Sequence, residues 1–512
     1  MAHARRLPCL VALAAVLTLC SSAGGRAPAA QSLPTTHLVI VVDGLRPDYV
    51  TPEGMPRLSR LGQRGMVFNA HHAVFPTVTR VNGSSFVTGA YPETHGLLGN
   101  TIYIPKVEPS KGLDTGVREN LEAVERAEGH LLTAPTLAEI LRPAGKTLMA
   151  VSSGSSGSAF LLNHTAGNGT TIHTEFTWPL AFAPRALAAL GAVPAKAMPN
   201  DAQNRYAIDA YLKVGLEEIR PDVTLMWLND PDGTAHAKGM GHEMSRRSLT
   251  LVDAGIGHIE DTLRARGLLD RTNIIVTSDH GFSTHTGELR LGPLVEPFAK
   301  TLADGSKDIA VAEGAIYLRS GHDSARVAEI VAALQQRPEV GAIFTRPAPG
   351  RPSEGVVPGT LSFNVARWNH ARSGDILVSA DWTDGTNDAG YKGTTTQGGV
   401  AGHGTSSPHD IHNTLIVAGP DFREGATSGV PTGNVDIAPT LLHLLGLPVP
   451  ATMTGRVIEE GLRKGPLPAS LRVEHARERA RSADGGYDVT AHISLVAGRR
   501  YLDFTEVARP PR

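Results

Sequence analysis

The feature that most constrains the fold is a series of short apolar runs that are continuous rather than alternating. They fall at His37–Val42, Thr147–Val151, Val223–Leu228, Asn273–Thr277 and Thr414–Ala418. Strands buried on both faces have this pattern, whereas strands with one solvated face alternate. Helical spacing of apolar residues separates the runs, clearest at 249–263 and 435–445. The alternation predicts an α/β fold, a doubly wound, mostly parallel sheet with helices on both faces.

Length and charge narrow the class further. The 512 residues have room for one large α/β domain with insertions or for more than one domain. The chain holds 48 basic and 50 acidic residues, for a net charge of −2. Because this balance leaves no strongly basic surface, we expect no nucleic-acid-binding patch.

The first 30 residues are typical of an export signal. Arg5 and Arg6 precede the apolar run Leu7–Leu19, and the small-residue stretch SSAGGRAPAAQ follows. We expect cleavage between about residues 23 and 30, a periplasmic or extracellular protein, and no transmembrane domain in the mature chain. An uncleaved membrane anchor is the alternative. Both cysteines, Cys9 and Cys20, lie in this signal, so the mature chain has no thiol chemistry.

Two interruptions of the strand–helix pattern predict accessory structure. Residues 163–205 are rich in Ala, Pro and Gly and are interpreted as a lid. Residues 283–400 have their own strand–helix alternation and are interpreted as a small inserted subdomain or cap. Near the C-terminus, Tyr487–Val496 and Arg500–Val507 predict a β-hairpin.

Acidic and imidazole side chains stand where the predicted strands end. Ligands of such sheets bind outside the carboxyl ends of the strands. The six residues are Asp43, Asp232, His236, Asp279, His280 and His403. Singly, Asp43 could cap a turn and His403 could be an ordinary loop residue. Together the six predict a metal centre.

The six residues divide into two sets of three. Asp279 and His280 are adjacent and combine with Asp43, whereas Asp232 and His236 are one helical turn apart and combine with His403. Three N and O ligands with an open fourth position are typical of catalytic zinc. We therefore expect two Zn²⁺ ions, with other divalent metals as alternatives. Two metals about 4 Å apart suit displacement at phosphorus.

Thr79 is the candidate nucleophile. It lies in FPTVTRVNGSSFVTG, just before a short helix predicted at Asn82–Thr88, whose N-terminus would present N–H groups to a phosphate. The alternative is that Thr79 only caps this helix. Asn100 offers an amide donor for a non-bridging phosphate oxygen.

These residues and their surroundings resemble the alkaline phosphatase superfamily, and within it the nucleotide pyrophosphatase/phosphodiesterase branch. The strings TGAYPETHGLLGN and VDIAPTLLHLLGLPVP carry the resemblance beyond the single residues. It covers residues 36–455, which implies an alkaline phosphatase-like catalytic domain there and an extension with the hairpin at 456–512. It also implies that Asp232, His236 and His403 hold one zinc. Asp43, Asp279 and His280 would hold the other, which activates Thr79.

Two departures from the family pattern bear on the substrate. Members that grip nucleotides have an aromatic residue after the nucleophile, in a Thr-Phe-Pro-Asn pattern, where this chain has Arg80. We expect Arg80 to bind substrate, by stacking or by gripping an anionic group. The loop Val151–Ser158 reads VSSGSSGS and lacks the Lys-x-Arg pair of related monoesterases. A diester monoanion needs less positive charge, so diesters are favoured.

The sequence thus predicts an exported two-zinc phosphodiesterase or nucleotide pyrophosphatase-like enzyme that acts on a small-molecule phosphate ester through a phosphothreonine intermediate. A phosphomonoesterase or phosphonate hydrolase using the same site is the alternative. A remote alternative is a non-catalytic protein that binds metal or a phosphoester. Nothing in the sequence predicts the oligomeric state.

Overall fold

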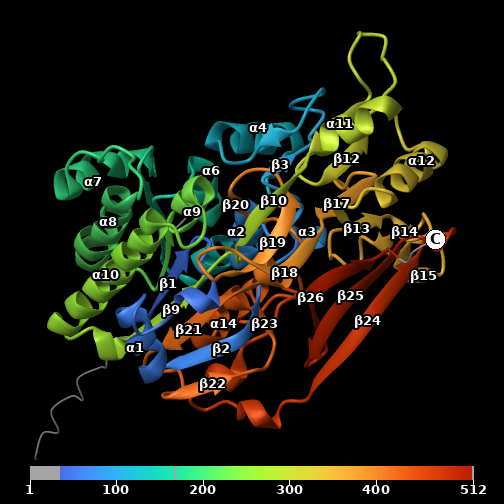
Figure 1. Ribbon diagram of the computed structural model, residues 1–512. Coiled ribbons are helices and arrows are strands. Elements are labelled where there is room, and N and C mark those ends of the chain that lie inside the picture. Colours follow the sequence, from blue (N-terminus) through green and yellow to red (C-terminus); the bar gives the residue numbers. More distant parts are fainter. Residues whose placement is uncertain (1–34, 166–168, 510–512) are drawn as a thin grey trace, which may run out of the picture. The chain divides into compact units, whose positions relative to one another are not determined.

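A ten-stranded sheet is the centre of the computed structural model, which describes residues 35–165 and 169–509 (Figure 1). The strands follow the order β22-β2-β21-β9-β1-β8-β5-β6-β7, with β23 beside β2. Their bounds are β1 Thr36–Val42, β2 Met66–His72, β5 Leu148–Ser152, β6 Gly169–His173, β7 Thr177–Trp178, β8 Val223–Leu228, β9 Thr272–Thr277, β21 His412–Ala418, β22 Ala426–Ser428 and β23 Thr432–Gly433. The predicted export signal lies outside the described residues.

The middle of this sheet is parallel. β1 pairs in parallel with both β8 and β9, and β5 pairs in parallel with β8 and β6. β21 runs antiparallel to β9 and to β2. The five apolar runs of the sequence form β1, β5, β8, β9 and β21, so the predicted mostly parallel α/β sheet is confirmed.

Helices cover both faces of the sheet. In β1, Leu38, Ile40 and Val42 pack into one buried cluster, whereas Val39 and Val41 pack into another. Helices of the first cluster are α1 Pro56–Arg64, α8 Asp201–Asp209 and α10 Glu243–Ala265. Those of the second are α2 Thr79–Thr88, α6 Ser156–Leu162 and α14 Ile437–Leu444. This double covering explains why the strands are apolar throughout.

Residues 283–402 build two further sheets. The four-stranded sheet has the order β18-β19-β10-β20, and the seven-stranded sheet has the order β11-β12-β17-β13-β16-β15-β14. Strand bounds are β10 Ser283–Leu289, β11 Ile309–Ala312, β12 Ala315–Leu318, β13 Val340–Thr345, β14 Pro347–Ala348, β15 Arg351–Gly355, β16 Leu361–Ser362, β17 Ile376–Ala380, β18 Trp382–Thr386, β19 Lys392–Gln397 and β20 Ala401–Gly402. Helices α11 Leu291–Val295 and α12 Ser324–Gln335 accompany them.

A three-stranded antiparallel sheet, red in Figure 1, ends the described chain. It comprises β24 Val473–Arg481, β25 Asp488–Val496 and β26 Arg499–Ala508. The turn at Ala497-Gly498 joins β25 to β26, at the hairpin that the alternating pattern predicted. The sequence pattern did not reveal the third strand, β24, because its outward residues are mostly charged.

Shorter elements complete the structure: β3 Thr101–Ile102, β4 Leu113–Asp114, α3 Pro92–His95, α4 Arg118–Glu128, α5 Leu137–Leu141, α7 Ala183–Leu190, α9 Asp232–Lys238, α13 Pro408–Ile411 and the π-helical segment Ala210–Ile219. The sequence predicted a lid over 163–205, but β6 and β7 of that segment are the last strands of the central sheet. Thr170, Thr171 and Ile172 of β6 are buried and β-branched, which favours a strand. Within the described residues, no helix has the length and apolar character needed to cross a membrane.

Candidate active site and metal ligands

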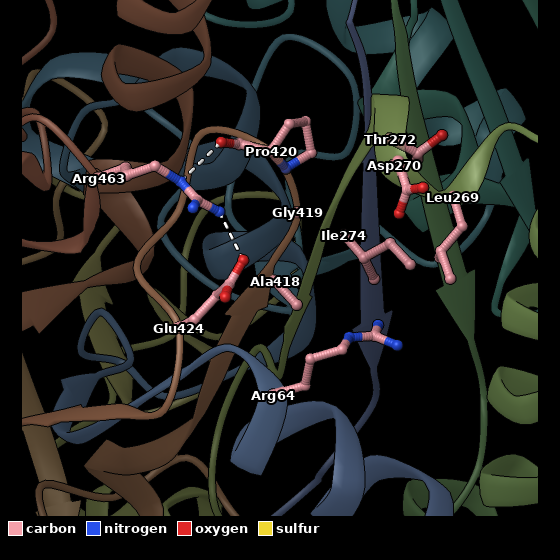
Figure 2. A pocket seen from close by; sticks show the side chains of 10 residues that line it. All are labelled: Arg64, Leu269, Asp270, Thr272, Ile274, Ala418, Gly419, Pro420, Glu424 and Arg463. Atoms are coloured by element: carbon pink, nitrogen blue, oxygen red, sulfur yellow. Dashed lines mark hydrogen bonds and ion pairs between the residues drawn. The ribbon is translucent and has the colours of Figure 1, made fainter.

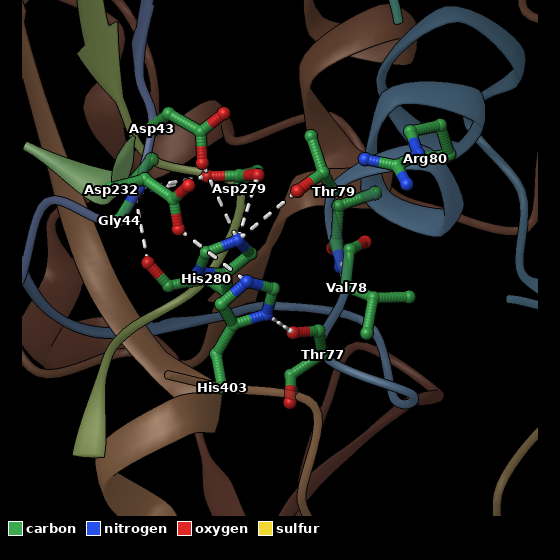
Figure 3. A network of polar contacts seen from close by, with 12 residues as sticks. Asp43, Gly44, Thr77, Val78, Thr79, Arg80, Asp232, Asp279, His280 and His403 are labelled. Carbon is green, nitrogen blue, oxygen red and sulfur yellow. Dashed lines mark hydrogen bonds and ion pairs between the residues drawn. The ribbon is translucent and has the colours of Figure 1, made fainter. Parts of the chain in front are cut away.

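The carboxyl ends of three neighbouring strands bring the predicted ligand residues together. Asp43 follows β1, Asp279 and His280 follow β9, and Asp232 starts α9 just after β8. Because β1 lies between β8 and β9, Asp43 stands between the other two groups. His403 joins them from the segment after β20 (Figure 3).

The first set consists of Asp43, Asp279 and His280, all buried. One atom from each of these residues lies within 4.8 Å of the others. His280 Nε2 is 3.1 Å from Asp279 Oδ2 and 3.5 Å from Asp43 Oδ1. Three ligand atoms therefore converge on one point at the strand ends.

The second set consists of Asp232, His236 and His403, whose ligand atoms also lie within 4.8 Å of one another. Asp232 and His236 are one turn apart on α9, as their four-residue spacing predicts. Asp232 Oδ1 is 3.1 Å from His236 Nε2 and 3.4 Å from His403 Nε2. The two sets adjoin, because the rings of His280 and His403 stack with centroids 3.4 Å apart.

Backbone carbonyls determine the tautomer of all three histidines. The Nδ1 nitrogens donate to Ala401 O (from His236, 2.9 Å), Gly281 O (from His280, 2.9 Å) and Thr77 O (from His403, 2.7 Å). A carbonyl only accepts, so Nδ1 carries the hydrogen and a neutral ring presents its Nε2 lone pair to the carboxylates. Metal-binding histidines are held by the same kind of outer hydrogen bond.

The three aspartates have carboxylate oxygens without hydrogen-bond donors in the described part of the chain. One oxygen of each aspartate is buried and has no hydrogen-bond partner among the described residues: Asp43 Oδ1, Asp232 Oδ1 and Asp279 Oδ2. Buried lone pairs that face other lone pairs are unfavourable unless a cation lies among them. The donor set therefore fits divalent metal ions in both sets.

Burial and neighbouring charges shift the pKa values of three of the candidate ligands. Burial, reinforced by the Asp279 and Asp232 carboxylates, raises the pKa of Asp43 well above its usual range. Burial alone would lower the pKa of His236, but the Asp232 carboxylate outweighs it and raises the value to about 9. Burial and the neighbouring His280 lower the pKa of His403 to about 4. The raised pKa values of Asp43 and His236 both reflect neighbouring carboxylates, whose negative charge metal ions would offset.

Other residues hold the ligands in place, and the sequence analysis did not find them. Trp227 Nε1 donates to Asp43 Oδ2 at 2.9 Å, Gly44 N donates to Asp279 Oδ1 at 3.1 Å, and Asn434 Nδ2 donates to the backbone oxygen of Asp279 at 2.9 Å. Trp227 was interpreted as core, and it is fully buried. A buried indole N–H usually has an acceptor, which is the signal that could have identified Trp227 as a partner of the site.

Thr79 directs its hydroxyl at the metal-ligand sets (Figure 3). Its Oγ1 is 3.5 Å from His280 Nε2. Thr79 is the first residue of α2, which starts three residues earlier than predicted; the N-cap position belongs to Val78, and no side chain caps the helix. The alternative that Thr79 serves as the N-cap is therefore wrong.

Asn100 and Arg80 lie beside Thr79. Asn100 Oδ1 accepts a hydrogen bond from Arg80 N at 3.0 Å, which orients the amide and leaves its NH₂ group for another acceptor. The Arg80 guanidinium is 3.7 Å from Asp114 Oδ1, and its Nε donates to Thr115 Oγ1 at 3.4 Å. Arg80 is thus held by its own neighbours while its side chain stays 17% exposed.

Glycine permits the close approach at the second set. A Cβ atom at Gly402 would lie 2.9 Å from His236 and 2.7 Å from His285, so only glycine fits between the two rings. His285 donates from Nδ1 to Gly398 O at 2.9 Å, and its buried Nε2 has no hydrogen-bond partner in the described part of the chain. His285 therefore borders the site without belonging to either set.

A separate cavity of about 490 Å³ lies at the opposite edge of the central sheet (Figure 2). Thr272 at the start of β9 and Ala418 at the end of β21 line it. Arg463 and Glu424 beside it form a 2.7 Å ion pair, and Arg64 pairs with Glu260 at 2.6 Å. The cavity has none of the six predicted ligand residues.

The fold and the site define a class: an alkaline phosphatase-like α/β protein with candidate metal ligands at the carboxyl edge of its sheet. Residues 37–404 match the family model described as type I phosphodiesterase / nucleotide pyrophosphatase. The chain belongs to this family, whose members hydrolyse phosphoric esters. The resemblance that the sequence motifs indicated is thereby confirmed.

Individual relatives have low sequence identity to this chain. The human bis(5'-adenosyl)-triphosphatase ENPP4 is 25% identical over 446 residues, covering 83% of this chain and 81% of the relative. Human ectonucleotide pyrophosphatase/phosphodiesterase family member 1 is 28% identical over 259 residues, covering 50% of this chain but only 24% of the relative's length. Murine ectonucleotide pyrophosphatase/phosphodiesterase 5, solved as an inactive variant in complex with AMP, matches with a TM-score of 0.55 and 19% identity. That match covers 82% of this chain and 96% of the murine chain and supports the fold.

Proposed function

We propose that this protein is an exported two-zinc phosphodiesterase, similar to nucleotide pyrophosphatases, that acts through a covalent phosphothreonine. The observation that carries the proposal is the buried Thr79 hydroxyl beside two adjoining sets of metal ligands, 3.5 Å from His280 Nε2. A binding protein has no need of a hydroxyl in this position.

The two sets have separate tasks in this proposal. Asp43, Asp279 and His280 hold the zinc next to Thr79, and Asp232, His236 and His403 hold the second. Zinc bound there supplies Lewis-acid charge that polarises the phosphoryl group and offsets its developing negative charge. Nitrogen and oxygen donors suit zinc, and manganese or iron are the metals to test beside it.

Thr79 and Asn100 act on the phosphoryl group directly. The Thr79 hydroxyl gives its proton to solvent, its oxygen attacks phosphorus, and the bond from phosphorus to the leaving oxygen breaks, so that the leaving oxygen takes up a proton from water. Water then hydrolyses the phosphothreonine ester, which releases the phosphoryl group and restores the hydroxyl. The Asn100 NH₂ group, oriented by the Arg80 N–H, donates to a non-bridging oxygen. Backbone N–H groups at the start of α2 add to the same charge stabilisation.

A phosphodiester or pyrophosphate bond is the best-supported target. The segment Ser152–Ser158 brings no cation, and Arg80 already has Asp114 beside it. A monoester dianion would therefore lack compensating charge, whereas a diester monoanion needs less. A nucleotide diester is one candidate, since a solved relative binds AMP, but Arg80 replaces the aromatic residue on which a base would stack.

A comparison of substrates tests this proposal. Rates on bis-p-nitrophenyl phosphate, a nucleotide diester, p-nitrophenyl phosphate and phosphonoacetate are measured with the zinc-loaded protein. We expect the two diesters to be hydrolysed fastest. A large preference for p-nitrophenyl phosphate or phosphonoacetate would instead favour a monoesterase or phosphonate hydrolase with the same residues.

The remaining proposals concern processing and organisation. We propose removal of residues 1–30 during export, a catalytic domain at 36–455 with its insertion at about 283–400, and an extension at 456–512. N-terminal sequencing of protein recovered from the cell exterior tests the first. A start at Met1 would contradict cleavage.

A further inference from the structure

A third group of candidate metal ligands lies outside the two sets described above. It consists of His72 on β2, His412 on β21 and Asp503 on β26, and one atom from each lies within 4.8 Å of the others. His72 and His412 are directly opposite in the antiparallel pair of β2 and β21, with ring centroids 4.7 Å apart. Asp503 reaches them from the C-terminal sheet.

The hydrogen bonds of His72 leave a lone pair facing a carboxylate. Its Nδ1 is 2.9 Å from the backbone oxygen of Thr432, which only accepts, so Nδ1 carries a hydrogen. Its Nε2 is 2.8 Å from Asp503 Oδ1. In a neutral ring this nitrogen has no hydrogen to give. A proton or a metal cation is therefore required between the imidazole and the carboxylate.

The arrangement repeats that of the ligands in the active site. His236, His280 and His403 each donate from Nδ1 to a backbone carbonyl and turn Nε2 towards an aspartate, as His72 does. The neighbouring His71 is different, because Thr432 Oγ1 and Asn434 Oδ1 lie 2.9 Å from its two ring nitrogens. His71 is thus fully hydrogen-bonded by neutral partners, whereas His72 is placed like a ligand.

Asp503 and His412 complete the donor set. Ser494 Oγ donates to Asp503 Oδ2 at 2.8 Å and so orients the carboxylate. The Nδ1 of His412 is buried and has no hydrogen-bond partner among the described residues. An imidazole nitrogen without a hydrogen-bond partner, close to His72 and Asp503, is free to bind metal. A proton between His72 and Asp503 would leave the His412 Nδ1 without a partner, whereas a metal ion could bind all three residues.

We propose that His72, His412 and Asp503 form a third transition-metal site, with zinc as its ion. Two imidazoles and one carboxylate are the same donors as in the Asp232, His236 and His403 set. The bound ion would fasten β26 to β2 and β21 and so hold the C-terminal sheet against the central sheet. Solvent can supply a fourth ligand, because the Asp503 side chain is 16% exposed.

Metal counting tests this site independently of catalysis. The purified protein is stripped with a chelator, reloaded with zinc, desalted and analysed for zinc per chain by mass spectrometry. We expect three equivalents in the unaltered protein and two in Asp503→Asn, with unchanged hydrolytic activity. His258→Ala is the matched control: this exposed histidine lies on α10, belongs to none of the three sets and should leave three equivalents.

Two further variants make the result decisive. His412→Gln removes another ligand and should also give two equivalents, which covers a folding failure of Asp503→Asn. Asp232→Asn removes a ligand of the active site and should lower zinc and activity together, so failure of the proposed function is recognised separately. Unchanged zinc content on substitution of both Asp503 and His412 would overturn the third site. It would leave a proton shared by His72 and Asp503.

Discussion

The two edges of the central sheet both carry charged groups but use them differently. At the amino edge of β9, Arg463 and Glu424 beside the cavity form an ion pair of 2.7 Å, with its charges satisfied (Figure 2). At the carboxyl edge, carboxylate oxygens of Asp43 and Asp279 are buried without hydrogen-bond partners. The comparison teaches that unsatisfied buried lone pairs, rather than charge or cavity volume, mark the candidate active site.

Replacement of Thr79 should have the largest effect. Thr79→Ala removes the proposed nucleophile, so we expect kcat to fall by about 10³-fold or more, as for other covalent catalysts. Zinc content should not change. The control is Thr272→Ala at the opposite edge, which should leave kcat as it is. Steady-state kinetics check both, and near-normal turnover in Thr79→Ala would refute the nucleophile.

Loss of a candidate metal ligand should have the second-largest effect on activity. Asp232→Asn leaves the volume but removes the charge that faces His236 and His403, and we expect activity to fall by about 10²-fold or more with weaker zinc binding. Chelation should inactivate the unaltered protein, and zinc should restore it. Asp270→Asn at the opposite edge is the matched control. An equal loss of activity in Asp232→Asn and Asp270→Asn would contradict the assignment of the active site to the carboxyl edge.

Trp227→Phe tests the residues that hold the candidate ligands in place by hydrogen bonds. The substitution keeps an aromatic ring in the core but deletes the N–H that holds Asp43 Oδ2. Outer partners of metal ligands typically contribute about 10-fold to 100-fold in metal affinity or activity. We expect a loss of this size, measured by zinc titration and kcat/KM. If only thermal stability changed, Trp227 would be a core residue alone.

Arg80→Ala should alter substrate preference more than overall rate. Arg80 stands beside Thr79 but is paired with Asp114, so its loss should change KM by about 3-fold to 10-fold, mostly for substrates with a second anionic group. Arg64→Ala, in the cavity at the other edge, is the control. The same ranking of substrates before and after Arg80→Ala would argue against a substrate contact.

Stability of the metal-free protein should depend on pH. The pKa of His236 rises from 6.5 to about 9 in the fold, so its contribution to stability is complete below about pH 6.5 and is lost by about pH 9. The raised pKa of Asp43 acts in the same direction. We expect the melting temperature of chelated protein to fall over this window. Zinc-loaded protein should change less, and identical pH profiles would contradict the assignment of His236 as a ligand.

Much of the fold was predictable because the strands are buried on both faces. Continuous apolar runs identified β1, β5, β8, β9 and β21 to within two residues, since packing on both sides excludes polar residues. The sequence analysis missed β24, which has charged outward residues, and β6 and β7, the last two strands at one side of the central sheet. Strands at the edge or surface of a molecule carry a weaker pattern, and neighbours in space decide whether they pair.

The proximity of the six candidate ligand residues was predictable because strand ends of one sheet meet at one edge, whatever their distance in sequence. The division into sets came from spacing, because Asp232 and His236 are four residues apart and Asp279 and His280 are adjacent. Asp43 and His403 completed the sets, and the family resemblance implied the same division. Trp227, which donates a hydrogen bond to Asp43, could not be predicted in this way. Trp227 has the sequence context of a core residue, and only its N–H direction in the folded chain makes it part of the site.

By itself the sequence determined the class of fold, the sheet edge at which the candidate ligand residues gather and the residue types that could hold metal. These properties follow from hydrophobic pattern and local chemistry. Tertiary structure alone decided which side chains meet: the His280 ring stacks on His403, the Trp227 N–H donates to Asp43, and Asp503 lies beside His72 and His412. The physical reason is that a ligand set needs positions correct within about an ångström, and packing of distant segments sets those positions.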